Sequence, residues 1–393
     1  MRATTRPLPG DVDLNDFAGR EGFLFVRDGV GLAGRGVAAR ISAPSVHRFL
    51  AEIETDDTVR QPGCGPIAMG VLPFRPGSAA RMVVPAVIVG KGPEGHRWIT
   101  TIGEVAADTT VFERPSPTAG TFSVRHGVPV DTYLAAVAAA RDAVAAGELE
   151  KAVIARDIFV ESSQTLDVHA ILLRLRAAFG SSYRYSIDGF VGASPELLVA
   201  RYGHVVRSHP LAGTVPRHGD PTTDARLAAE LLASVKNQVE HRVVIDSVHD
   251  MLLPYCSYLD WEPEPSILAV ANVQHLATLI EGRLSDPPPN VLDLARMLCP
   301  TPALGGAPRR EALALIDEVE GMDRGRYGGA VGWVDAAGNG TWAVAIRCAE
   351  LSADRRTARL FAGGGIVAAS DPLAELAETQ AKFQAMLSAI IRP

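Results

Sequence analysis

Three charged side chains near the end of the sequence share one side of an expected helix. Glu375, Glu378 and Lys382 are separated by three and four residues, a spacing that places side chains on one helical face. Three glycines at 363–365 precede this helix, and glycine lets a backbone approach a ligand closely because it has no Cβ atom. A charged face of this kind is usually solvated. The glycine run before it indicates instead that these carboxylates have a partner elsewhere in the chain.

Glu240 is a candidate for that partner. At helical spacing it aligns with Val244 and Val248, so it belongs to an apolar stripe rather than to a solvated face. An ionised carboxylate in such a stripe is costly unless it is paired or binds a metal. Two glutamates on different helices suit Mg²⁺, which keeps several waters and takes one or two carboxylates. A buried glutamate–arginine pair is the alternative.

Two further side chains could move protons. Lys151 opens the expected strand KAVIARD, where a lysine commonly reaches out to water; in a dry pocket the neutral amine would be favoured and could act as a general base. Glu196 follows a proline-containing turn and precedes an apolar strand. A buried glutamate keeps its proton more readily and can donate it, so this position suits a general acid.

The elements that must position these residues follow from local signals. We expect a mostly β N-terminal part over 1–120, a linker within 114–122, and a catalytic region over 121–393 that belongs to the same body. Strands in runs, mixed with long helices, point to the α+β class. The expected helices cover 131–147 with Asp131 as N-cap, 168–179, 223–253, a segment capped by Asn290, 308–320, and a terminal helix.

The terminal helix has the clearest start signal. Asp371 is suited to the N-cap position and Pro372 to the first helical position. Leu373, Leu376, Phe383 and Leu387 then recur at helical spacing and predict a face that packs on the core.

The sequence GVGLAG at 29–34 matches the dinucleotide-binding pattern G-x-G-x-x-G. Only GVAARIS separates it from Pro44, which is too short for the helix that this pattern requires. We therefore interpret the segment as a turn-rich hairpin.

Composition excludes several classes of protein. The chain has 393 residues, of which 47% are hydrophobic, and a net charge of −7; with no basic stripe we expect no nucleic-acid binding. No run approaches the ~18 apolar residues of a membrane span, and no signal peptide is recognisable. The four cysteines form no C-x-x-C pair, which argues against a zinc site or a disulfide framework. A soluble, cytoplasmic protein is expected.

Several ordered motifs resemble the chorismate-binding enzyme family, and within it the isochorismate synthases. The motifs are EKAVIARD, GASPELLV, HPLAGTVPR, KNQVEHRVV, VQHLATLIEG, PTPALGGAP, YGGAVGW, AIRCAEL and AGGGIVAASDP. They occur in the family's order over about 125–390. The resemblance implies one large α+β body of two mainly antiparallel sheets packed together, with helices outside.

The resemblance also implies an activity. Such enzymes are hydroxymutases: water attacks C2 of chorismate while the C4 hydroxyl leaves, which gives isochorismate reversibly. Lys151 matches the lysine that activates water and Glu196 the glutamate that protonates the departing hydroxyl. Glu240 and Glu378 match the pair that holds Mg²⁺.

The remaining matched residues would bind substrate. Lys382, Arg347 and Tyr327 match residues that bind its carboxylates. The backbone around four further residues would assist, and two residues of the PTPALGG loop would line the pocket: Gly213, Thr214, Gly363, Gly365, Ala303 and Leu304. Relatives that install ammonia carry a threonine in the segment of Ala303 and rely on a glutaminase subunit. We therefore expect water as the nucleophile and no glutaminase partner. No membrane partner and a monomeric enzyme are also expected.

One position departs from the family pattern. Isochorismate synthases commonly have a histidine before PTPA, where this chain has Cys299; a structural cysteine packed behind the loop is the milder interpretation. The nearest alternative activity is that of a salicylate synthase, which goes on to eliminate pyruvate. A nicotinamide-dependent oxidoreductase and a non-catalytic partner subunit are the alternatives from other classes. The isochorismate could feed menaquinone, a catecholate siderophore or salicylate.

Overall fold

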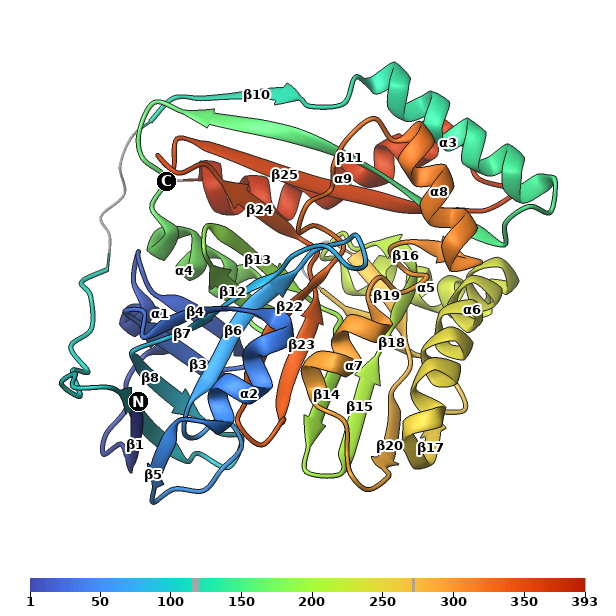
Figure 1. Ribbon diagram of the computed structural model, residues 1–393. Helices are drawn as coiled ribbons and strands as arrows, with labels where there is room; N and C mark the ends of the chain where they lie inside the picture. Colours follow the sequence, from blue (N-terminus) through green and yellow to red (C-terminus); the bar gives the residue numbers. More distant parts are fainter. Residues whose placement is uncertain (115–119, 271–272, 393) are drawn as a thin grey trace.

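The chain folds around two large β-sheets. The computed structural model describes residues 1–114, 120–270 and 273–392, and within these ranges the strands form a 13-stranded sheet, a 9-stranded sheet and a 3-stranded sheet (Figure 1). We call them the large, second and small sheets. Only β1 and β5 pair in parallel within the same ranges, and the other pairs are antiparallel. The predicted α+β class and the two mainly antiparallel sheets are confirmed. The small sheet was not predicted.

The large sheet joins strands from both ends of the sequence. In spatial order its strands are β10 (Phe122–His126), β11 (Lys151–Ser162), β25 (Thr357–Ile366), β24 (Cys348–Leu351), β13 (Phe190–Ser194), β12 (Tyr183–Ile187), β2 (Phe23–Arg27), β3 (Val30–Arg35), β8 (Val87–Lys91), β9 (Arg97–Ile102), β1 (Arg2–Pro7) and β5 (Glu54–Asp57), with β21 (Gly306–Ala307) beside β11.

The other two sheets are shorter. The second sheet runs β17 (Cys256–Trp261), β20 (Ile280–Leu284), β15 (Val205–His209), β14 (Leu197–Tyr202), β23 (Gly340–Val344), β22 (Ala330–Asp335), β6 (Ile67–Leu72), β7 (Arg81–Val84) and β4 (Ala39–Ser42). The small sheet contains β16 (Leu211–Pro216), β19 (Val273–Ala277) and β18 (Ser266–Ala269).

The N-terminal strands are built into both large sheets. β2 pairs with β12 and β6 pairs with β22, so residues 1–120 share sheets with the rest of the chain. The boundary at 120 itself stays a prediction. Most of the expected linker, 115–119, lies outside the described residues.

The helices cover the outer faces of the sheets. They are α1 (Leu14–Ala18), α2 (Val46–Ala51), α3 (Val130–Ala145), α4 (Val168–Ala178), α5 (Pro221–Ala233), α6 (Val235–Leu252), α7 (Val291–Leu298), α8 (Arg309–Val319) and α9 (Pro372–Ile391), with short 3₁₀ turns at Ala43–Ser45 and Leu253–Tyr255.

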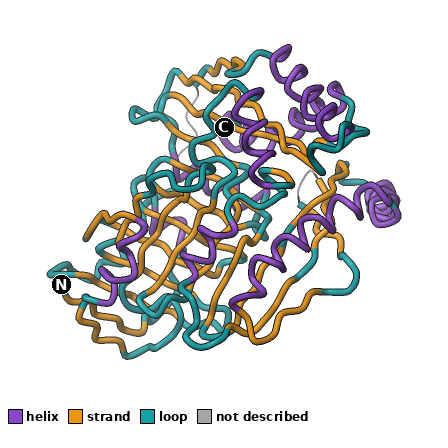
Figure 2. The backbone as a smooth tube through the Cα atoms, turned by 45° about the vertical axis from the view of Figure 1, so that its right-hand side comes forward, coloured by secondary structure: helices purple, strands orange, loops and turns teal. Residues whose placement is uncertain are grey.

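Apolar side chains form separate layers on the two faces of the large sheet. Toward the second sheet, Phe25 and Leu32 share a core with Val71 and Val331. On the opposite face, apolar residues of α1, α4 and α9 pack against the strands, and α3 and α8 cover the start of β11. In Figure 2 the strands form the body of the molecule and a group of helices caps its upper end. Within the described ranges, no helix combines the length and apolarity needed to cross a membrane.

Two local predictions are confirmed by the cap geometry. Asn290 Oδ1 accepts a hydrogen bond from the backbone N–H of Leu292 at 2.8 Å, so α7 starts where predicted. Asp371 Oδ1 accepts one from Ala374 at 2.8 Å and Pro372 opens α9. The segment at 29–34 lies in the β2–β3 hairpin, as predicted.

Three other predictions are wrong. The expected helix over 223–253 is broken at Ser234, whose extended backbone ends α5 and whose side chain caps α6. Asp131 lies in the first turn of α3, and Pro129 occupies the cap. Leu373 is 65% exposed while Glu375 is only 7% exposed. The first turn of α9 therefore turns its acidic side inward, because the cavity described below lies there.

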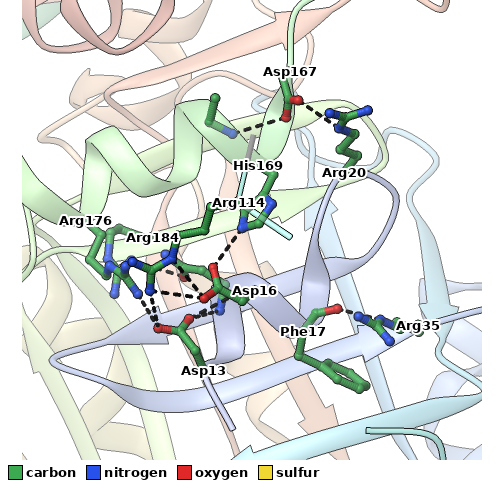
Figure 3. A network of polar contacts seen from close by, with 12 residues as sticks. Asp13, Asp16, Phe17, Arg20, Arg35, Arg114, Asp167, His169, Arg176 and Arg184 are labelled. Carbon is green, nitrogen blue, oxygen red and sulfur yellow. Dashed lines mark hydrogen bonds and ion pairs between the residues drawn. The ribbon is translucent and has the colours of Figure 1, made fainter. Parts of the chain in front are cut away.

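A partly buried polar cluster joins the N-terminal helix to α4 (Figure 3). We call Asp13, Asp16, Arg114, His169 and Arg176 the α1–α4 polar cluster. Asp13 accepts from two backbone N–H groups of α1 and from Arg176 at 2.5 Å. Asp16 lies 2.9 Å from His169 Nε2 and 3.1 Å from Arg114. Each carboxylate thus has more than one partner at hydrogen-bonding distance, and the contacts to His169 and Arg176 tie α1 to α4.

Candidate active site

A cavity of about 250 Å³ lies where the chain crosses between the two large sheets. Glu196 sits in the crossing from β13 of the large sheet to β14 of the second sheet, and Arg347 sits in the return crossing from β23 to β24. β11, β25, the small sheet, α6 and α9 supply the remaining walls. Because no single sheet continues through a crossing, side chains there can point into a space between elements.

Every site residue predicted from the sequence lines this one cavity: Lys151, Glu196, Gly213, Thr214, Glu240, Ala303, Leu304, Tyr327, Arg347, Gly363, Gly365, Glu378 and Lys382. They come from nine separate segments of the chain. The structure thus brings the predicted residues together, while their individual roles remain predictions.

The two expected proton-transfer groups are both buried. Lys151 Nζ lies 2.7 Å from Glu240 Oε1, so the lysine points into the cavity instead of reaching outward to solvent. Glu196 Oε1 accepts a long bond of 3.4 Å from the backbone N–H of Leu211. Burial raises the pKa of Glu196 to about 8, against the smaller opposing effects of Leu211, Lys151 and Arg347. Near neutral pH this glutamate therefore carries its proton.

The three glycines of β25 make room for side chains. A Cβ atom on Gly364 would lie 2.5 Å from Glu375 Oε2, and one on Gly365 would lie 2.7 Å from Glu240 Oε1. A Cβ on Gly363 would lie 3.0 Å from the Tyr327 hydroxyl. The run is therefore needed for the close approach of the carboxylates to the strand, and the approach of a ligand at the same place stays a prediction.

Two carboxylates beside these glycines, Glu375 and Glu378, have pKa values shifted in opposite directions. Burial, and then the neighbouring Glu378, raise the pKa of Glu375 to about 7. Ser370 donates to Glu375 Oε1 at 2.9 Å, but Glu375 Oε2 is buried without a hydrogen-bond partner among the described residues. Glu378 is paired with Lys382 at 2.5 Å; although burial opposes it, this ammonium brings the pKa of Glu378 below its ordinary value.

These residues fit the predicted Mg²⁺. Across the described parts of the chain, no three or more His, Cys, Asp or Glu side chains are grouped closely enough to hold a metal on their own. Mg²⁺ does not require such a cage, because it commonly takes one or two carboxylates and completes its shell with water and substrate oxygens. Glu240 and Glu378 would be those carboxylates, and the orphaned oxygen of Glu375 is suited to a water bound to the metal.

Several cations also line the cavity. Arg347 has a left-handed backbone with φ of +50°, a strained conformation for a non-glycine residue, and burial lowers the pKa of its guanidinium. Lys382 Nζ donates to the carbonyl of Gly363 at 2.7 Å. Lys236 lines the cavity from the first turn of α6. A small anion with more than one carboxylate would meet positive charge on several sides.

Sequence reasoning assigned no role in the site to four polar residues of the lining: Glu375, Lys236, Asn237 and His275. Burial, and then Arg347 and Lys382, lower the pKa of His275 to about 3, so this imidazole is neutral. The last three lie inside motifs that were recognised, and Glu375 lies three residues before Glu378. Proximity to matched positions was therefore the available signal.

Cys299 does not line the cavity. Its Sγ packs near the carbonyls of Pro73 and Gly328 at 4.0 and 3.9 Å, and burial raises the pKa of the thiol to about 12. The thiol therefore stays protonated behind the loop at 300–305, in line with the milder interpretation.

Size alone does not identify the site. A larger cavity of about 520 Å³ lies between the two large sheets, with Phe25, Trp98 and Trp333 among its walls. None of the predicted site residues lines it. The smaller cavity is the candidate active site because the titratable groups and the cations converge there.

The comparisons with known proteins agree on one family. A family model described as "Chorismate binding enzyme" matches residues 87–391. The chain is 40% identical over 368 residues to the putative isochorismate synthase MenF of Mycobacterium tuberculosis strain H37Rv, covering 90% of this chain and 94% of that protein. It is 39% identical over 336 residues to the isochorismate synthase DhbC of Bacillus subtilis, covering 83% and 81%.

A solved structure is similar over nearly the whole chain. The crystal structure of a putative 2,3-dihydroxybenzoate-specific isochorismate synthase, DhbC from Bacillus anthracis, superposes with a TM-score of 0.81 at 33% identity. The similarity covers 96% of this chain and 98% of that one. The likeness therefore includes the N-terminal strands as well as the region that the family model matches.

Proposed function

Since the chain belongs to the chorismate-binding enzyme family, we propose that it is an isochorismate synthase. It interconverts chorismate and isochorismate by attack of water at C2 with loss of the C4 hydroxyl. The observation that carries the proposal is the pairing of a buried Glu196, which keeps its proton near pH 7, with Lys151 in one cavity. Acid and base with opposite protonation demands are what this reaction needs.

Glu196 is suited to the acid step. The C4 hydroxyl is a poor leaving group unless it is protonated as its bond to carbon breaks. With a pKa of about 8 the carboxyl is a donor near neutral pH, and its proton goes to the departing oxygen. In the reverse reaction the resulting carboxylate takes a proton from the attacking water.

Lys151 is suited to the base step. Its Nζ is held within the cavity by Glu240 at 2.7 Å, and the walls around it exclude bulk water. To accept a proton from the attacking water, the amine must be neutral and release its contact with Glu240. The proton that it accepts can return to solvent after product leaves.

The remaining charges orient the substrate. Arg347 and Lys382 pair with its carboxylates, and the neutral His275 lies 3.5 Å from an Arg347 nitrogen and steadies it. Mg²⁺ held by Glu240 and Glu378 would supply positive charge against the ring carboxylate and fix its orientation. Ala303 leaves the nucleophile position to water.

A product assay tests the proposal. Purified protein with MgCl₂ should convert chorismate into isochorismate, and isochorismate into chorismate, as followed by chromatography. Release of pyruvate with salicylate would identify a salicylate synthase. Anthranilate or aminodeoxychorismate formed with ammonium salts would overturn the assignment of water as nucleophile. No turnover in any arm would refute the proposed activity.

The setting of the enzyme is also part of the proposal. We propose that it works in the cytoplasm as a monomer. We also propose that it needs no glutaminase subunit, because water rather than ammonia is its nucleophile. Size-exclusion chromatography with light scattering tests the oligomeric state.

A further inference from the structure

A buried ion pair lies directly behind the candidate active site. Glu320 is the C-cap residue of α8 and Arg324 lies four residues further on, beyond the helix; their side chains are 0% and 2% exposed. Arg324 donates from Nε to Glu320 Oε1 at 2.7 Å and from a terminal nitrogen to Oε2 at 2.5 Å. Neither residue lines the cavity, so neither touches the substrate proposed above.

The other polar atoms of the pair form hydrogen bonds to two segments that line the cavity. Arg324 donates to the carbonyl of Val153 at 2.6 Å and to the carbonyl of Leu304 at 2.8 Å. Glu320 Oε2 accepts from the backbone N–H of Ala155 at 2.9 Å. One ion pair therefore holds β11 at two points and the loop at 300–305 at a third.

Those segments carry reactive and pocket-forming groups. Lys151 lies two residues before Val153 on β11, and Ala303 precedes Leu304 on the loop. The backbone N–H of Tyr327 donates to the carbonyl of Arg324 at 3.0 Å, and the guanidinium lies 5.9 Å from the tyrosine ring. The same two residues thus contact three parts of the cavity wall that are far apart in the sequence.

We propose that Glu320 and Arg324 are positioning residues of the reaction, which fix Lys151 relative to the loop that carries Ala303. The proposal rests on the isochorismate synthase function proposed above. A buried ion pair is weak evidence for stability, because apolar residues of similar volume often replace one without loss of stability. What apolar residues cannot replace is the set of three hydrogen bonds to the cavity wall.

A double variant separates positioning from stability. In Glu320→Leu/Arg324→Met the volume is largely kept and no charge is left unpaired. We expect a folded protein with a kcat lower by about 10–10²-fold and a smaller change in KM, because small displacements of a reacting group are costly in rate. Hydrogen exchange should be faster at the amides of 152–156 and 301–305.

A second variant covers the case in which the double variant does not fold. Arg324→Lys keeps a cation beside Glu320, but an ammonium lacks the planar fork that reaches both carbonyls. We expect this variant to fold, with a kcat between those of the wild type and the double variant. A kcat equal to that of the wild type would overturn the proposal.

The matched control is a buried pair away from the cavity. Asp16→Asn/His169→Leu removes the pair of the α1–α4 polar cluster and should leave kcat and the exchange of 152–156 and 301–305 unchanged. A folded Glu320→Leu/Arg324→Met variant with a kcat within about threefold of the wild type, or with unchanged exchange in both segments, would overturn positioning. Wild-type protein that makes no isochorismate refutes the proposed function instead, and the exchange comparison then decides the positioning of the two segments on its own.

Discussion

The α1–α4 polar cluster and the candidate active site both contain carboxylates and cations, but they differ in how many hydrogen-bond partners their carboxylates have. In the cluster, Asp13 and Asp16 each accept from several donors at hydrogen-bonding distance, and Figure 3 shows the cations turned toward them. In the cavity, Glu375 keeps one buried oxygen with no partner among the described residues, and Glu196 has one long bond.

The two regions differ in whether the protein itself supplies hydrogen-bond donors to its carboxylates. Where donors are built in, a charge helps to hold elements together, here α1 against α4. Where donors are withheld, burial shifts protonation, and the pKa of Glu196 and of Glu375 rise to about 8 and about 7. Shifted groups of this kind mark sites where a substrate or metal supplies the missing partners. The following predictions test that comparison, from the largest effect on activity to the smallest.

Removal of metal should have the largest effect. Chelation with EDTA should abolish turnover, because Glu240, Glu375 and Glu378 would otherwise present negative charge to an anionic substrate. Addition of excess MgCl₂ should restore it, and Glu240→Gln should weaken binding of metal and substrate together, as measured by calorimetry. Undiminished turnover in excess chelator would contradict the assigned metal site.

Loss of the acid or the base should have the next largest effect. Lys151→Ala and Glu196→Gln should each lower kcat by about 10²–10⁴-fold, the usual contribution of general acid or base catalysis. The losses should be non-additive in the double variant, because both residues act in one transition state. A variant that keeps more than about a tenth of wild-type kcat would remove that residue from the assigned role.

The pH profile of the wild-type enzyme follows from the acid of this pair. Activity should fall on the alkaline side as Glu196 loses its proton near pH 8. Glu196→Gln should remove the alkaline limb from the residual activity. Persistence of that limb in the variant would assign it to another group.

Glu375→Gln should stabilise the folded protein at high pH, whereas loss of the Asp16–His169 pair should destabilise it. Because the pKa of Glu375 is raised to about 7, the folded protein binds more protons than the unfolded chain between about pH 4.5 and 7, and stability from this group falls as pH rises through that window. The variant should melt at a higher temperature than the metal-free wild type at pH 8, with little difference near pH 4. Mg²⁺ should bind to it about 10-fold more weakly, as expected for an outer-shell ligand. A lower melting temperature at pH 8 would contradict the prediction.

Loss of the polar-cluster pair should have the smallest effect on activity. Asp16→Asn/His169→Leu should lower the free energy of unfolding by about 1–3 kcal/mol, since hydrogen bonds to a charged group are lost. Denaturant titration measures this change. The values of kcat and KM should be those of the wild type, and a change in either would mean that the cluster is coupled to the active site.

The starts of α7 and α9 were predictable from the sequence alone. A cap depends on one side chain and a backbone N–H two or three residues away, as at Asn290 and Asp371. The membership of the chain in its family was predictable for a similar reason, because the matched motifs are short, local and ordered. The break at Ser234 was missed, since an apolar pattern continued on both sides of it.

Only the tertiary structure decided which charges are buried and what they face. Glu375 and Leu373 are two residues apart, and the pattern assigned the leucine to the core; the cavity between α9, α6 and β25 reversed the assignment. The effect of Arg347 on the protonation of Glu196 and the bond from Arg324 to the carbonyl of Val153 likewise join residues more than 100 positions apart. Helix caps are set by contacts within one turn of the chain, whereas desolvation and the electric field at a site are summed over every element that packs around it.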